Sequence, residues 1–209
     1  RSGNPVHRLN GKALIDQAIN NRISHYDLPQ VYTNNIIRNS LIKEIREQSG
    51  GVFYHELNPD VYSGVVVAQK ARRLLRCGRP VFWTGTSPKS VGVSIAKSNE
   101  EDSEKDSEFA KRSKEFFMLA EAQGVGVAPE LGINRWRKLK SSPLFVYSAL
   151  RMSPFTCCTD QENKVLLEKA IQATIIAERR VGRVQPESTN IGILEEFADE
   201  VGVSVEKAN

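Results

Sequence analysis

Apolar residues recur every three or four positions in three stretches of the first half of the chain, and this spacing predicts amphipathic helices. The first stretch covers residues 11–25, and the second covers 34–51, where two consecutive glycines end it. The third begins at Pro59, a residue suited to the first turn of a helix, and runs to Arg76, with Gly78 just past its end. The first half of the chain is therefore predicted to be mainly helical.

The second half continues with further helices separated by irregular segments. Residues 98–108 are charged and poor in aromatic side chains, which indicates a solvated loop leading into a helix over 109–124. A long helix is predicted over residues 160–180. "VGVSIAK" at 91–97 and "VGVSVEK" at 201–207 also suit short strands. Together these patterns predict a mainly α fold of about five or six helices, with long irregular connectors and extended arms in place of one compact core.

Two short motifs occur twice in the same order, which indicates an internal duplication. "RCGRP" at 76–80 resembles "RVGRV" at 180–184, and "VGVSIAK" resembles "VGVSVEK". Each pair follows a long predicted helix, so we expect these two helices to superpose, with Gly78 and Gly182 past their ends at positive φ. The pattern divides the chain into an N-terminal helical arm (1–52), a first repeat unit (53–110), a connecting helix with a basic aromatic segment (111–155) and a second repeat unit (156–209).

The composition bears on three classes of protein: nucleic-acid binders, membrane-spanning proteins and disulfide-rich proteins. The chain has 209 residues and a net charge of +4, with an isoelectric point near 9.0, which favours an acidic partner but is a small excess for a dedicated nucleic-acid binder. Its apolar runs are too short to predict a membrane span. Two of the three cysteines, Cys157 and Cys158, are adjacent, so the cysteines do not form a disulfide framework.

The stretch "RRLLRCGR" sets arginines on both sides of Cys77. Positive charge lowers the pKa of a thiol, but cations followed by glycine are also typical of the end of a helix. On the second interpretation Cys77 packs beneath a helix cap. A cysteine enzyme needs a histidine base within reach, and the scattered histidines form no such pattern. Because the phosphate-loop and zinc-protease motifs are also missing from the sequence, we expect a non-catalytic protein.

The segment "INRWRKLK" at 133–140 places Trp136 among four cationic side chains. An aromatic ring among cations suits base stacking beside phosphates, and it suits equally an anchor that docks on an acidic protein. The sequence leaves these two interpretations open. Under either, Trp136 is predicted to be exposed and to lie at an intermolecular contact.

The twin units, each a helix followed by "R-x-G-R" and then "V-G-V-S", together with Cys77 and Cys158, resemble the gamma-type linker subunits of red-algal phycoerythrin. The likeness covers roughly residues 55–207. In that family the linker threads stacked rings of acidic phycobiliproteins, and cysteine thioethers hold open-chain tetrapyrroles, the bilins. The resemblance implies a linker or scaffold of a light-harvesting antenna, with phycobiliprotein alpha and beta subunits and other linkers as partners. It also implies a place on the stromal side of the plastid thylakoid, peripheral to the membrane.

The resemblance further implies a chromophore site. Cys77 is the implied attachment residue, with Arg73 and Arg76 at one helix end as partners of the bilin propionates. Cys158 is a second candidate, preferred over Cys157 because it is nearer the start of the following helix. The implied cofactor is a phycobilin, either phycoerythrobilin or phycourobilin, walled by the residues that follow Cys77, namely Pro80, Phe82 and Trp83.

An alternative function follows from the same charge. A basic chain with an aromatic segment is also typical of a nucleocapsid or coat-like assembly protein that binds RNA. Such binding weakens steeply with salt, because the cations displace counterions from the phosphates.

Overall fold

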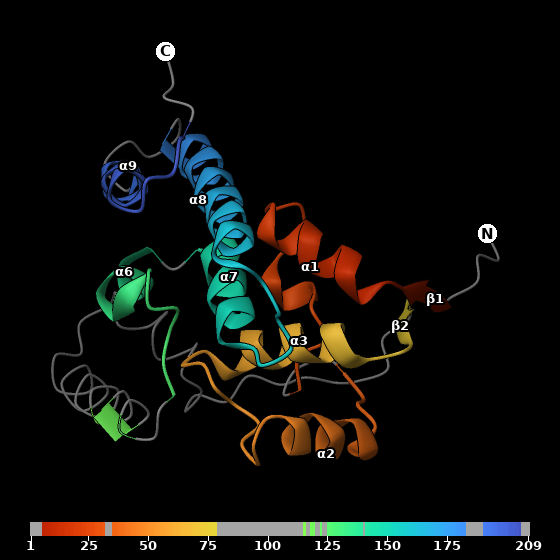
Figure 1. Ribbon diagram of the computed structural model, residues 1–209. Helices are drawn as coiled ribbons and strands as arrows, with labels where there is room; N and C mark the ends of the chain where they lie inside the picture. Colours follow the sequence, from red (N-terminus) through yellow and green to blue (C-terminus); the bar gives the residue numbers. More distant parts are fainter. Residues whose placement is uncertain are drawn as a thin grey trace, which may run out of the picture.

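The computed structural model describes residues 6–31, 35–78, 125–139, 141–182 and 190–205, together with Glu115, Met118, Leu119 and Ala122. In these residues the fold is mainly helical, with seven α-helices and two short strands (Figure 1). The elements, in chain order, are β1 (Val6–Leu9), α1 (Gly11–Ile19), the 3-10 turn η1 (His25–Asp27), α2 (Asn39–Gln48), α3 (Pro59–Lys70), β2 (Leu74–Cys77), α6 (Gly132–Leu139), α7 (Ser142–Met152), α8 (Asp160–Gly182) and α9 (Ile191–Glu200). The prediction of a mainly α fold is confirmed.

The helices begin and end at residues that suit a helix terminus, namely a capping asparagine, a proline in the first turn and glycines past the last turn. The side chain of Asn10 accepts a hydrogen bond from the Ala13 amide and caps α1. Pro59 lies in the first turn of α3, as predicted. Past α2, Gly50 and Gly51 adopt φ angles of 70° and 89°, a region that side chains with a Cβ disfavour, so the paired glycines end this helix.

One hydrophobic core cluster holds the described residues together. The helices α3 and α7 form its centre, and Figure 1 shows α7 lying between α3 on one side and α8 on the other, with α1 alongside. In α3 every residue from Val61 to Ala68 is buried. The cluster takes residues from all four predicted units, from Leu14 near the start to Val203 near the end. The described residues thus share one core, and the expected extended arms are not found among them.

The third predicted helix is shorter than its sequence pattern indicates. It ends at Lys70, and Leu74–Cys77 forms a strand that pairs antiparallel with β1, with Leu9 opposite Leu74. Both leucines pack against the core. The strand pairing satisfies backbone groups that a longer helix would have satisfied, so packing overrides the helix propensity of the alanine, arginine and leucine residues in this stretch.

The described residues do not show the expected duplication. The first of its two predicted helices changes into a strand before Gly78, whereas α8 runs without a break to Gly182 and includes it. Neither glycine therefore follows the end of a matching helix. The second "VGVS" motif begins at the C-cap of α9, where Gly202 has a φ of 64°, and is not a strand. The first "VGVS" motif and the predicted loop over 98–108 lie outside the described residues, as does most of the predicted helix over 109–124.

Three further helices, α6, α7 and α9, have no counterpart in the prediction. Seven of the eleven residues of α7 are buried, so its apolar side chains do not form a single stripe that a periodicity search detects. The long predicted helix over 160–180 is confirmed by α8. No helix in the described part of the chain has the length and apolar character that crossing a bilayer requires.

Candidate functional site

Cys77 lies at the end of β2 with its thiol exposed and unbridged. The interpretation that packs it beneath a helix cap is wrong, because the helix ended seven residues earlier at Lys70. In an antiparallel pair, residues directly opposite each other point to the same face. Leu9 and Leu74 are opposite and face the core, so Leu75 and Cys77, one and three residues further along β2, point to the other face, with Leu75 66% exposed. The β1–β2 ribbon therefore presents a solvent-exposed surface beside the thiol.

A close approach of two helices shapes the surface next to this ribbon. A Cβ on Gly11, the first residue of α1, would lie 1.9 Å from the carbonyl oxygen of Ala68 in α3, so only glycine fits there. This contact brings the N-terminal end of α1 to the C-terminal end of α3. An open hollow lies at the junction, and Arg8, Lys12 and Arg72 contribute its charged lining.

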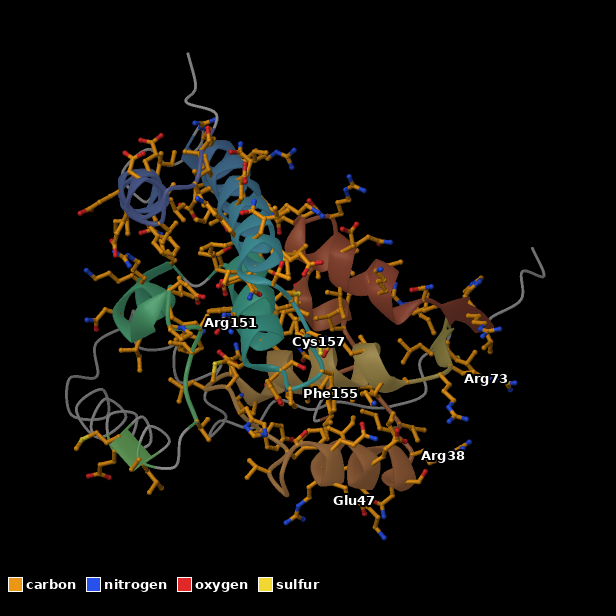
Figure 2. The ribbon with its side chains drawn as sticks, viewed as in Figure 1. Arg38, Glu47, Arg73, Arg151, Phe155 and Cys157 are labelled. Carbon is orange, nitrogen blue, oxygen red and sulfur yellow. The ribbon has the colours of Figure 1, made fainter. Side chains whose placement is uncertain are left out.

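The two arginines expected to bind propionates differ in their surroundings. Arg76 donates through its guanidinium to Asp27, 3.3 Å from Oδ1 and 3.4 Å from the main-chain oxygen, and both side chains are half-exposed. Arg73 lies in the exposed link before β2 (Figure 2). The prediction that they share one helix end is wrong, since Arg73 precedes a strand and Arg76 belongs to it.

Three cationic side chains line this hollow, and three more belong to the adjoining end of α3, to the link after it and to β2; we call these six residues the cationic corner. Its members are Arg8, Lys12, Lys70, Arg72, Arg73 and Arg76. Asp27 forms an ion pair with one of them. The whole chain has a net charge of only +4, so the rest of it is slightly acidic in sum. The corner therefore carries a local excess of positive charge within the described part of the chain.

The other two cysteines lie in the loop between α7 and α8, which packs on the C-terminal end of α3. The Ser153 hydroxyl donates to Gln69 Oε1 at 2.7 Å, and Gln69 Nε2 donates to Thr156 Oγ1 at 2.8 Å. The ammonium of Lys70 stands 4.8 Å from the centre of the Phe155 ring. These contacts place the loop beside the cationic corner, and Figure 2 shows Phe155 and Cys157 over α3 with Arg73 farther along towards β2.

Within this loop the structure favours Cys157 over the expected Cys158. Cys157 is exposed, whereas Cys158 is partly buried and burial raises the pKa of its thiol, with Glu162 and Cys157 adding to the shift. A raised pKa lowers the thiolate fraction, which is the reactive form. Glu162 is held at this place because it forms a reciprocal cap with Thr159, whose amide donates to it at 2.8 Å. The same helix start that suggested Cys158 thus makes its thiol less reactive.

A second cluster of polar groups, centred on Glu56, lies inside the core. Glu56 is 1% exposed; the Asn58 amide donates to its Oε2 at 2.6 Å, and the Ser148 hydroxyl to its Oε1 at 3.3 Å. Ser148 also accepts a hydrogen bond from the Ala128 amide at 3.1 Å, which ties α7 to the segment before α6. Burial raises the pKa of Glu56 to about 8, although hydrogen bonds from Asn58, Ser148 and Trp136 oppose the shift. The carboxyl group is therefore mostly protonated at neutral pH.

Trp136 belongs to this buried cluster and not to an exposed contact surface. Its ring lies 5.3 Å from that of Phe145, it packs against the core, and its indole nitrogen is buried on the side of Glu56. The prediction of an exposed indole is wrong. The neighbouring Arg135 lies over the Phe197 ring and forms an ion pair with Glu200, so this basic residue is occupied within the chain. The local sequence does not reveal that α6 turns its aromatic residue inward.

The two clusters differ in what they can do chemically. Glu56 is closed off from solvent and offers no access for a substrate, so its cluster is structural, whereas the cationic corner is open and can bind anions. Among the described residues, no three His, Cys, Asp or Glu side chains gather as metal ligands. Pro80, Phe82 and Trp83, the expected walls of a bilin site, lie outside the described residues. Comparisons with protein family models, curated proteins and solved structures found no match to this chain.

Proposed function

We propose that this chain is a non-catalytic linker or scaffold subunit that docks its cationic corner on an acidic protein partner. The observation that carries the proposal is the group of cations around the junction of α1 and α3, of which Arg8, Lys12 and Arg72 line one open hollow. Such a group attracts an acidic surface and orients the encounter, so it provides specificity and speed of association. Neighbouring cations also repel one another, and an acidic partner relieves that repulsion.

The sequence resemblance supplies the identity of the proposed partner, an acidic phycobiliprotein ring, and of the proposed ligand, a bilin on Cys77. The exposed, unbridged thiol supports attachment there. Arg73 is the stronger partner for a propionate because Arg76 must first give up Asp27. An exposed ion pair contributes at most about 1 kcal/mol, so Arg76 can exchange Asp27 for a propionate at small cost in free energy. Cys157 takes the place of Cys158 as the second attachment candidate.

Two measurements on the native chain test the proposal. The first is co-sedimentation with purified phycobiliprotein rings at low and moderate salt, with single-stranded RNA as the competing ligand. Ring binding that survives an excess of RNA supports the linker function, whereas preferential binding of RNA with a steep salt dependence supports the coat-like alternative. The second is mass spectrometry of the tryptic peptide containing Cys77. A tetrapyrrole adduct supports the chromophore role, and an unmodified peptide removes it while leaving the linker role intact.

A further inference from the structure

The β1–β2 ribbon is a sheet of two strands of four residues each, and no other described strand joins it. A two-stranded ribbon is marginal by itself, and a third strand stabilises it by adding a row of main-chain hydrogen bonds. The edge of such a ribbon is a template for another extended chain. In this protein the ribbon lies at the cationic corner, so its charge favours pairing with an extended chain that is acidic.

Cationic side chains sit within and beside the ribbon. Arg8 is in β1, Arg76 is in β2, and Arg72 and Arg73 immediately precede β2. A second copy of this chain would bring the same charges against them, so the corner disfavours pairing with itself. An acidic chain meets opposite charges instead. In β2 the exposed Leu75 shares one face with Cys77, and Arg76 points to the other face, so an incoming strand meets an apolar contact on one face and a cationic contact on the other.

We infer that the β1–β2 ribbon accepts an extended acidic segment of the partner as a third strand. This inference rests on the proposed docking of the cationic corner and specifies its mode: main-chain hydrogen bonds give affinity, and the arginines select for acidic residues. The occupant is a peptide segment in which acidic residues alternate with apolar ones, because side chains of a strand alternate between its two faces.

The test uses the full chain and a fluorescent peptide in which glutamate alternates with valine. Fluorescence anisotropy gives its affinity, and the matched peptide N-methylated at its backbone amides keeps the charge but loses the donors. Hydrogen exchange of the protein amides at 7–9 and 74–76 reports whether a ladder forms. Arg8→Glu is compared with Lys169→Glu, the same charge reversal on the exposed face of α8.

The inference predicts that the unmethylated peptide binds and slows amide exchange in one of the two strands. N-methylation abolishes binding, and Arg8→Glu weakens it about tenfold while Lys169→Glu leaves it within about twofold. Equal binding of the methylated peptide, or binding without slower exchange, overturns strand addition but leaves charge-driven docking of the partner standing. Failure of the unmethylated peptide to bind also overturns strand addition, and co-sedimentation with the acidic ring then decides the proposed function separately.

Discussion

Replacing Glu56 by glutamine tests whether a buried acid limits the stability of this fold at neutral pH. Three parts of the chain enclose the carboxyl group: the start of α3, the segment that precedes α6, and helix α7. It accepts hydrogen bonds from the Asn58 amide and the Ser148 hydroxyl. Glutamine keeps the shape and an oxygen that accepts from Asn58, but it does not ionise. The change therefore removes the titration and little of the packing.

The size of the effect follows from the pKa. Folding raises the pKa of Glu56 from 4.5 to about 8, so the folded state holds its proton more tightly than the unfolded state. The resulting stability is fully present below the unfolded pKa and is lost as pH rises through the folded pKa. At about 1.4 kcal/mol per pKa unit, the wild type loses about 5 kcal/mol between these two values, a large part of a typical stability of roughly 5–15 kcal/mol.

The assay is urea unfolding followed by far-UV circular dichroism at several pH values between the two pKa values. Other carboxylates titrate in the same range, so the informative quantity is the difference in unfolding free energy between variant and wild type. The unfolding free energy of Glu56→Gln is expected to increase relative to that of the wild type as pH rises. Glu47 is on the exposed face of α2, so the unfolding free energy of Glu47→Gln should change with pH as that of the wild type does. A difference for Glu56→Gln that does not change with pH would refute the reasoning.

Three further predictions concern packing and thiol access. Gly11→Ala should destabilise the fold by about 1–3 kcal/mol because its Cβ meets the Ala68 carbonyl, whereas Gly192→Ala, whose Cβ meets nothing within 4 Å, should be neutral or slightly stabilising; thermal unfolding of both variants decides it. Tyr62→Phe should change the unfolding free energy by less than about 1 kcal/mol, since the buried hydroxyl has no hydrogen-bond partner among the described residues; a larger loss in urea unfolding would show that the hydroxyl is bonded. Cys77 should react with a thiol reagent faster than Cys158 in single-cysteine variants, and equal rates would contradict their difference in exposure.

The helices that the sequence predicts are those with local signals. In α1, α2 and the start of α3, an apolar stripe is bounded by an asparagine cap, a proline or paired glycines, and each signal acts within a few residues. In α7 the apolar residues cover most of the surface, so the stripe disappears although the helix is well buried. The periodicity of a sequence reports one exposed face, and a central helix has none.

The candidate site was less predictable because it depends on contacts between distant segments. Residues 71–77 favour a helix locally, and their strand exists because β1, from the start of the chain, pairs with it. In that pairing Cys77 is exposed, Arg76 is part of the strand and Arg73 lies in the link before it. The burial of Glu56 has the same origin, since helices from the other half of the chain enclose it. The sequence identified the arginines and the cysteine, and tertiary packing decides how they are presented.

Charge reversal in the cationic corner tests the central claim most directly. The double variant Arg72→Glu and Arg73→Glu changes two exposed residues, and Lys169→Glu combined with Arg180→Glu is the matched change on α8. The measurement is the affinity of each variant for the acidic phycobiliprotein ring at physiological ionic strength. We predict a loss of roughly tenfold to a hundredfold for the corner variant and little change for the α8 variant. Equal affinities for the two variants, with unchanged circular dichroism, would contradict docking through the cationic corner.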